Sequence, residues 1–178
     1  MTSTSLGSIP AWAMPMGMTT TAPTPTASEQ PPRIELNGPA PDFQANTTHG
    51  PIQLSTWQKD KWVILFSHPA DFTPVCTTEF IEFARRNDEL AAKGVAVIGN
   101  SIDSIYSHIA WVRNIEEKFG VKIPFPVIAD LDQKVARLYN MVHVPSSVTA
   151  AVRCVFFIGI GRQRDDRRAR QALRQLAG

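Results

Sequence analysis

Short apolar runs that alternate with helical patterns restrict the fold of this chain more than any other feature. Four runs have the β-branched and aromatic composition of buried strands: residues 61–67, 95–100, 125–130 and 151–158. Helical patterns lie between them, at residues 104–119 and 131–141. Strands separated by helices are joined by crossovers onto a parallel or mixed sheet. The sequence therefore predicts an α/β domain over residues 33–160, with a central mixed sheet flanked by helices.

The composition agrees with one globular domain of ordinary size. The 178 residues are 43% hydrophobic and 19% charged. No apolar run approaches the roughly 18 residues that cross a bilayer. Two cysteines, Cys76 and Cys154, are too few for a disulfide framework and favour a reducing compartment. We therefore expect a cytoplasmic protein with no membrane partner.

Both ends of the chain differ from its middle. Residues 1–32 are rich in Thr, Ser, Pro and Met and have their first charge at Glu29, which favours a disordered leader. The first basic residue is Arg33, which argues against a secretory signal or a mitochondrial presequence. Residues 161–178 carry six arginines against two aspartates, whereas the net charge of the whole chain is only +2. Because the basic character belongs to this tail, we expect no nucleic-acid surface on the domain.

The segment HPADFTPVCTTEF, residues 68–80, places Cys76 at the start of a helix. It follows the apolar run at 61–67, and active residues gather where the strands of an α/β sheet run into helices. Thr73 is suited to cap the helix and Pro74 to its first position, so Cys76 falls in the first turn. The free N–H groups and the helix dipole favour an anion there, and a thiolate is the anion available. On position alone, an unreactive buried cysteine is the alternative.

The same segment closely resembles the active-site motif of the peroxiredoxins, Pro-x3-Thr-x2-Cys, here Pro69, Thr73 and Cys76. The resemblance extends over residues 33–158, and the PVCTTE variant is similar to the one-Cys subgroup and its archaeal and bacterial relatives. It implies a thioredoxin-like fold and the thiol-dependent reduction of hydrogen peroxide and organic hydroperoxides, with no cofactor.

The resemblance also implies roles for individual side chains. Cys76 would be the peroxidatic cysteine and become a sulfenic acid. Thr73 would offer its hydroxyl to the thiolate and the peroxide, and Pro69 would shield the pocket from water. Arg153 would supply positive charge; an exposed or ion-paired strand arginine is the alternative. Glu79 would position active-site groups, although a first-turn carboxylate favoured by the helix dipole is an equal alternative.

The histidines are weaker candidates. His68 directly precedes Pro69 and either lines the pocket or packs as a satisfied histidine. We interpret His108 and His143 as structural or surface residues, and His49 falls in an expected turn. No group of His, Cys and carboxylate residues has metal-ligand spacing along the chain, so we expect no metal site.

The second cysteine decides which redox cycle is available. Side chains of a strand alternate between its faces, so Arg153 and Cys154 point in opposite directions. If Arg153 faces Cys76, Cys154 faces away and is a poor partner for an intrachain disulfide. We therefore expect a one-Cys cycle in which an external thiol reduces the sulfenic acid. Glutathione, a thioredoxin-type protein and a small thiol all remain open.

After residue 158 the chain departs from the peroxiredoxin pattern. The resemblance would lead to a turn, an edge strand, a closing helix and an arm used in dimer packing, whereas GIGRQRDDRRARQALRQLAG follows. This ending leaves the strand at 151–158 poorly covered, so we expect a homodimer or a larger homo-oligomer. The leading hypothesis is a peroxidase. The alternative is a non-catalytic, redox-responsive or chaperone-like relative, or a defective product.

Overall fold

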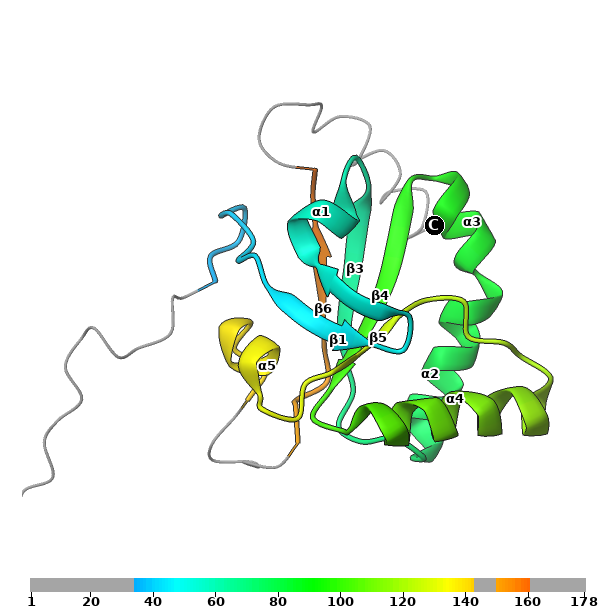
Figure 1. The fold of residues 1–178 in the computed structure, drawn as a ribbon. Coiled ribbons are helices and arrows are strands. Elements are labelled where there is room, and N and C mark those ends of the chain that lie inside the picture. The colour runs from blue at the N-terminus through cyan, green and yellow to red at the C-terminus, as the bar shows by residue number, and fades with distance from the viewer. Residues whose placement is uncertain (1–33, 143–149, 161–178) are drawn as a thin grey trace, which may run out of the picture. The chain divides into compact units, whose positions relative to one another are not determined.

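The structure, a computed structural model, describes residues 34–142 and 150–160 (Figure 1). The leader expected at 1–32, the tail expected at 161–178 and His143 lie outside the described residues. Their sequence-based assignments therefore stay predictions. No helix in the described ranges is long and apolar enough to cross a membrane.

The described elements begin with two consecutive strands, and the later strands are separated by one or two helices. Their order is β1 (Gln44–Thr47), β2 (Gly50–Gln53), α1 (Leu54–Gln58), β3 (Trp62–Ser67), α2 (Pro74–Arg85), α3 (Asn87–Ala92), β4 (Val95–Ser101), α4 (Ile105–Phe119), β5 (Val127–Ala129), α5 (Lys134–Leu138) and β6 (Cys154–Ile158).

A mixed sheet organises these elements, with the strand order β2-β1-β5-β4-β3-β6. The central strands β3, β4 and β5 are parallel, whereas β6 runs antiparallel to β3 and β1 runs antiparallel to β5. The predicted α/β class with a central mixed sheet is therefore confirmed. In register, Ser67 at the end of β3 lies opposite Cys154 at the start of β6.

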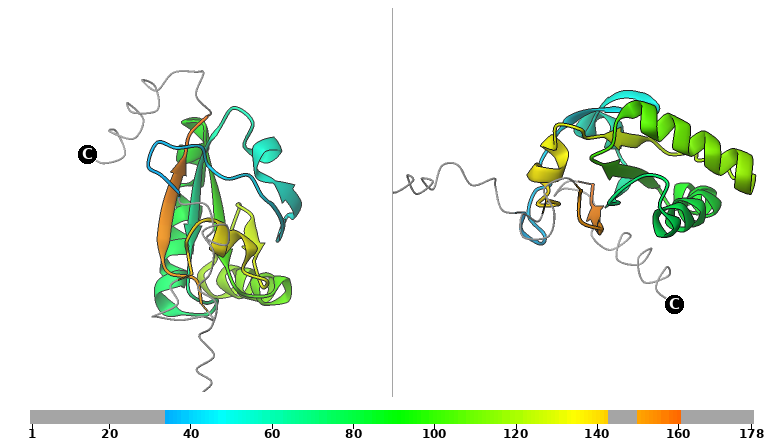
Figure 2. Two further views of the ribbon diagram at one scale, coloured as in Figure 1. Left: turned by 90° about the vertical axis from the view of Figure 1, so that its left-hand side faces the viewer. Right: turned by 90° about the horizontal axis from the view of Figure 1, so that it is seen from below.

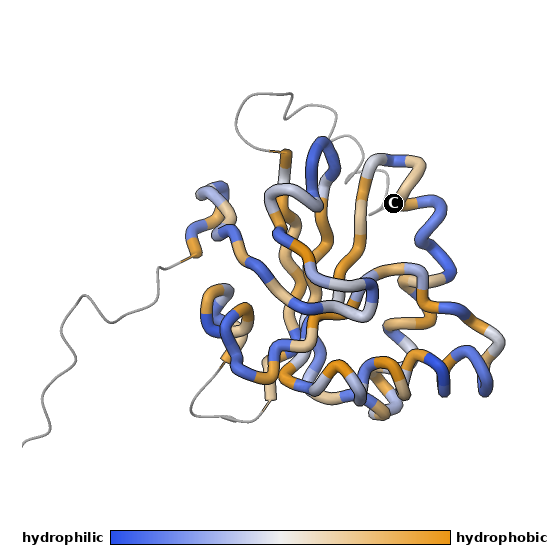
Figure 3. The backbone as a smooth tube through the Cα atoms, in the orientation of Figure 1, coloured by the Kyte–Doolittle hydropathy of each residue, from blue (hydrophilic) through white to orange (hydrophobic). Residues whose placement is uncertain are grey.

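Helices α2, α3 and α4 cover one face of the sheet. Ile64 and Phe66 of β3 point to this face and share a core cluster with Phe80 of α2, Leu90 of α3 and Trp111 of α4. The view from below in Figure 2 shows α2 and α4 on this side and α5 on the other. Along α4, hydrophobic and hydrophilic residues alternate (Figure 3), as expected for a helix with one buried side.

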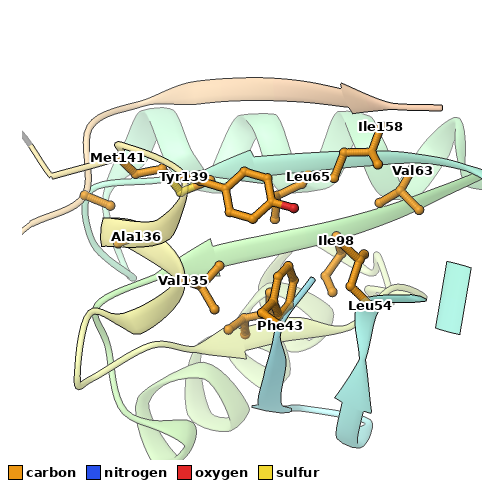
Figure 4. Packing of buried hydrophobic residues seen from close by; sticks show 12 residues of the cluster. Phe43, Leu54, Val63, Leu65, Ile98, Val135, Ala136, Tyr139, Met141 and Ile158 are labelled. Carbon is orange, nitrogen blue, oxygen red and sulfur yellow. The ribbon is translucent and has the colours of Figure 1, made fainter. Parts of the chain in front are cut away.

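The opposite face packs against α1 and α5. Val63 and Leu65 of β3 join Ile98 of β4, Leu54 of α1 and Val135 of α5 in a second cluster. Figure 4 shows side chains from the sheet and from α5 meeting there. Neighbouring residues of β3 thus enter different cores, which explains why the whole strand is apolar.

The boundaries of several elements differ from the expectation. Helix α4 matches its predicted range because Ser104 accepts a hydrogen bond from the Ser107 N–H at its start and Gly120 adopts φ 65° at its end. Helix α5 covers only part of residues 131–141, and β6 begins three residues later than the run at 151–158. The hairpin β1–β2 and helix α1 were not anticipated, because their residues are polar and their strands are short.

Candidate active site

The loop at residues 68–73 connects β3 to α2 and carries the sequence motif. Thr73 occupies the N-cap position of α2 with extended backbone angles, and Pro74 is the first helical residue. The expected side-chain cap is absent, because the Thr73 hydroxyl donates to the Ala70 carbonyl at 3.1 Å. Thr73 instead receives bonds at its carbonyl from the N–H and the hydroxyl of Thr77, at 3.0 and 2.8 Å. The hydroxyl therefore stabilises the loop rather than the helix terminus.

Cys76 lies in the first turn of α2 and is buried, with 1% of its surface exposed. A guanidinium nitrogen of Arg153, Nη2, lies 3.3 Å from its sulfur. Arg153 directly precedes β6, and the antiparallel pairing of β6 with β3 brings it to this face of the sheet. The arrangement places a fixed positive charge beside a thiol at a helix N-terminus, and both features are typical of the surroundings of reactive cysteines.

Glu79 binds the second terminal nitrogen of the same guanidinium. Its carboxylate forms an ion pair with Nη1 of Arg153, and about a third of each side chain is exposed, 35% in both cases. Cys76 and Glu79 are three residues apart on α2, so they share one side of the helix. Because α2 has no acidic residue in its first turn, the helix-dipole alternative for Glu79 does not apply. One terminal nitrogen of the planar Arg153 guanidinium thus contacts the thiol of Cys76, and the carboxylate of Glu79 binds the other nitrogen.

Asp71 connects the loop at residues 68–73 to α4 through buried hydrogen bonds. It is buried and accepts hydrogen bonds from His68 Nε2 at 2.9 Å, His108 Nδ1 at 2.8 Å and the Ser107 hydroxyl at 2.8 Å. Burial acts to raise the pKa of Asp71, but the bonds from His108, His68 and Ser107 outweigh it and lower the pKa to about 2. Asp71 is therefore a carboxylate at neutral pH.

His68 is buried against Phe80 and Trp111 rather than exposed in an open pocket. Burial lowers the pKa of His68, and the hydrogen bond to Asp71 opposes that change. Its Nε2 faces Asp71, whereas its Nδ1 has no hydrogen-bond partner among the described residues. His68 is therefore a neutral imidazole with one free acceptor nitrogen.

Three potential ligand residues meet at this anchor although they are dispersed in the sequence. One atom each of His68, Asp71 and His108 lies within 4.8 Å of the others. The spacing along the chain did not reveal this group, because His108 comes from α4. Each of these atoms already takes part in a hydrogen bond inside the group. The arrangement is accordingly a closed hydrogen-bonded network and not an open coordination site.

Comparison with known proteins decides the family. The model of the AhpC/TSA family matches residues 36–162. This chain belongs to the AhpC/TSA family. A peroxiredoxin of Aquifex aeolicus is 55% identical over 123 residues, which are 69% of this chain and 55% of that protein. Peroxiredoxin 2 of Thermoplasma acidophilum is 59% identical, over 67% of this chain and 58% of its own length. The chain thus spans less than two thirds of these AhpC/TSA relatives.

Solved structures of AhpC/TSA proteins show the same fold. A cysteine-to-serine mutant of the peroxiredoxin 6 of Arenicola marina has a TM-score of 0.65 at 32% identity, covering 71% of this chain and 60% of that one. A yeast mitochondrial 1-Cys peroxiredoxin has a TM-score of 0.63 at 33% identity, covering 82% and 76%. The expected thioredoxin-like fold is confirmed.

The second cysteine of the chain, Cys154, lies on the other face of the sheet. Its neighbours Val152 and Phe156 pack with it against the α5 side, as strand alternation predicts. Its sulfur is 3.0 Å from the hydroxyl of Ser67. Burial raises the pKa of the Cys154 thiol, and the bond to Ser67 only partly offsets this. Cys154 is therefore held as a neutral thiol, away from Arg153.

The fold brings part of the expected site together directly. Cys76, Arg153 and Glu79 are in contact, whereas Pro69 and Thr73 are half-buried in the adjoining loop. No role was expected for Asp71 from the sequence alone, although this residue lies inside the Pro-x3-Thr-x2-Cys motif. A hollow of about 730 Å³ lies elsewhere, between β1, β2 and the start of α5, and none of these residues lines it.

Proposed function

We propose that this chain is a thiol-dependent peroxidase with Cys76 as its nucleophile. The observation that carries the proposal is the 3.3 Å contact between Arg153 Nη2 and the sulfur of Cys76 in the first turn of α2. A nearby guanidinium stabilises a thiolate and the charge that develops on the departing oxygen. Membership of the AhpC/TSA family and the peroxiredoxin relatives support the same activity.

The chemistry follows from this placement. The Cys76 thiolate attacks one oxygen of a hydroperoxide, a sulfur–oxygen bond forms and the oxygen–oxygen bond breaks. The sulfur is oxidised to a sulfenic acid, and the peroxide is reduced to an alcohol or water after its leaving oxygen gains a proton. Arg153 donates to both the sulfur and the leaving oxygen. Thr73 and Pro69 lie half-buried in the loop before Cys76, where the peroxide would approach, and His68 packs behind this loop.

The oxidised cysteine is reduced by a thiol from outside the chain. One thiol condenses with the sulfenic acid to give a mixed disulfide and water, and a second thiol releases Cys76 and leaves as a disulfide. Cys154 is a poor partner because it packs on the opposite face of the sheet. Candidate reductants are glutathione, a thioredoxin-type protein and a small thiol. The solved yeast 1-Cys peroxiredoxin is described as resolved through glutathione and thioredoxin systems.

Self-association and a cytoplasmic location complete the proposal. Val155 and Phe157 of β6 are 47% and 55% exposed on the face that carries Cys76. Exposed apolar side chains on an outer strand favour pairing with another copy, so we expect a homodimer or a larger homo-oligomer. Free cysteines agree with a reducing compartment.

The test is peroxide consumption by the purified chain with dithiothreitol as reductant. The proposal expects turnover with hydrogen peroxide and with an organic hydroperoxide, together with trapping of a sulfenic acid on Cys76 by dimedone and mass spectrometry. Wild-type protein that folds but neither consumes peroxide nor forms the dimedone adduct would contradict it. That result would favour the alternative from the sequence, a non-catalytic, redox-responsive or chaperone-like relative or a defective product.

A further inference from the structure

The hydrogen bonds of His108 determine its charge. This residue is fully buried in the first turns of α4. Its Nε2 lies 3.0 Å from the carbonyl oxygen of Ile128 in β5, and its Nδ1 lies 2.8 Å from a carboxylate oxygen of Asp71. A carbonyl oxygen and a carboxylate oxygen only accept hydrogen bonds. With Asp71 as the carboxylate, both partners of the ring are acceptors, so the geometry points to hydrogen on both ring nitrogens, which makes the ring an imidazolium.

The surroundings of His108 agree with a buried ion pair. Asp71 supplies the negative charge, and it accepts additional bonds from the Ser107 hydroxyl and from the neutral His68. The other ionisable group at the network is Asp103, whose carboxylate accepts the Asp71 N–H at 3.1 Å. Strand β5 contributes only a backbone carbonyl, and α2 contributes the ring of Phe80.

The pair connects three elements at the active-site loop. His108 belongs to α4, its carbonyl partner belongs to β5, and Asp71 lies midway between Pro69 and Thr73 in the loop that leads to Cys76. The carboxylate is thus fixed by α4, which is itself tied to β5 through His108. None of these contacts involves Arg153 or Glu79.

We propose that His108 is a positioning residue: a buried imidazolium that fixes Asp71 and, through it, the loop that holds Pro69 and Thr73 over Cys76. This inference rests on the proposed peroxidase function. Removing one partner of a buried ion pair leaves the other charge uncompensated, so the loop is expected to rearrange. A displacement of about 1 Å at a reacting centre is enough to slow a reaction by roughly a hundredfold.

The proposal separates two properties of Cys76. Its sulfur adjoins the guanidinium of Arg153 at the start of α2, whereas the hydrogen bonds of His108 go to Asp71 and Ile128. The reaction with peroxide additionally needs the loop residues in place. The loss of His108 is therefore expected to slow peroxide reduction much more than alkylation by iodoacetamide, whereas general unfolding would alter both together.

The first experiment observes the protonation state directly. The full chain is labelled with ¹⁵N-histidine, and long-range ¹H–¹⁵N spectra are recorded at neutral pH, with assignment by single substitutions. We expect an imidazolium with two protonated nitrogens for His108 and a neutral ring protonated at Nε2 for His68. A neutral ring at position 108 would overturn the inference. A metal ion present at one equivalent in the purified protein, whose removal shifts these signals, would overturn it as well.

The second experiment compares His108→Gln with His49→Gln, because His49 is an exposed turn residue outside the network. We expect His108→Gln to lower the rate of Cys76 oxidation by peroxide about ten- to a hundredfold, with less than a threefold change in iodoacetamide alkylation. His49→Gln should change neither rate. A folded His108→Gln variant with wild-type peroxide kinetics would overturn the positioning role.

These readouts keep the inference distinct from the proposed function. Wild-type protein that fails to react with peroxide would reject the peroxidase proposal, while the spectra would still determine the charge of His108. If His108→Gln fails to fold, Ser107→Ala provides a milder change because it removes one hydrogen bond to Asp71. That variant should show the same separation of rates at smaller amplitude, and equal loss of both rates would count against positioning.

Discussion

The two cysteines of this domain have opposite surroundings. Cys76 is almost fully buried, yet its sulfur faces a guanidinium at the start of a helix. Cys154 is partly exposed, yet among the described residues its sulfur meets the hydroxyl of Ser67 and apolar side chains on the other face of the sheet. Exposure to solvent and contact with a cation are therefore separate properties of the two thiols, and the proposed function assigns the reaction to the thiol beside the cation.

The largest expected effect is the loss of Cys76. We predict that Cys76→Ser abolishes peroxide turnover, because a hydroxyl in this position is not a sufficient nucleophile, while the fold is retained because serine is nearly isosteric with cysteine. Peroxide consumption and circular dichroism are the measurements. Equal activity in the variant and the wild type would remove the distinction between the two thiols.

The next effect concerns the cation. Arg153→Met keeps most of the bulk and removes the charge, so peroxide reduction should slow by tens to hundreds of times, equivalent to about 2–4 kcal/mol of transition-state stabilisation. Arg113→Met is the matched control, because Arg113 is exposed on α4. If Arg153→Met changed the rate less than threefold and left the pH dependence of Cys76 alkylation unaltered, Arg153 would be structural.

Much of this contrast is predictable from the sequence, and the limits are physical. The central strands and α4 follow from local apolar runs and from the caps Ser104 and Gly120. Helical spacing alone places Glu79 beside Cys76, and strand alternation alone separates Arg153 from Cys154. The network around Asp71 was not predicted, because its two partners on α4 are 36 and 37 residues away and meet it only through tertiary packing.

A third prediction concerns the stability of the loop beside Cys76. The pKa of Asp71 is about 2 in the folded state against an ordinary 3.8, so its contribution is present above about pH 4 and is lost as the pH falls through 2. A difference of this size corresponds to roughly 2–3 kcal/mol. Asp71→Asn should flatten the acid-induced decrease in the free energy of unfolding between pH 4 and 2, measured in urea.

The control for that measurement is Asp60→Asn, because Asp60 is exposed at the turn before β3. It should keep the wild-type dependence on pH. If Asp71→Asn also kept it, the hydrogen bonds of Asp71 would not favour its carboxylate, and the loop would lack the electrostatic anchor described above.

The smallest effect is expected at the second thiol. Cys154→Ala should keep peroxide turnover within about threefold with dithiothreitol, because Cys154 faces away from Cys76. Since burial raises the pKa of its thiol, Cys154 in the wild type should be alkylated only at more alkaline pH than an ordinary cysteine. Non-reducing mass spectrometry after peroxide treatment checks the pairing directly. A predominant disulfide between Cys76 and Cys154 would show that the one-Cys assignment is wrong.

The contact between Cys76 and Arg153 also has a consequence for biosynthesis. The two residues are 77 positions apart, and the arginine reaches the sulfur only when β6 has added to the outer side of β3. A ribosome therefore releases the cysteine well before it releases the arginine. We expect the nascent thiol to be chemically ordinary and to become sensitive to peroxide only at the last strand-pairing step. In refolding experiments, sulfenic acid formation should then rise together with native tertiary structure, and chains in which β6 has not yet paired with β3 should react more slowly with peroxide.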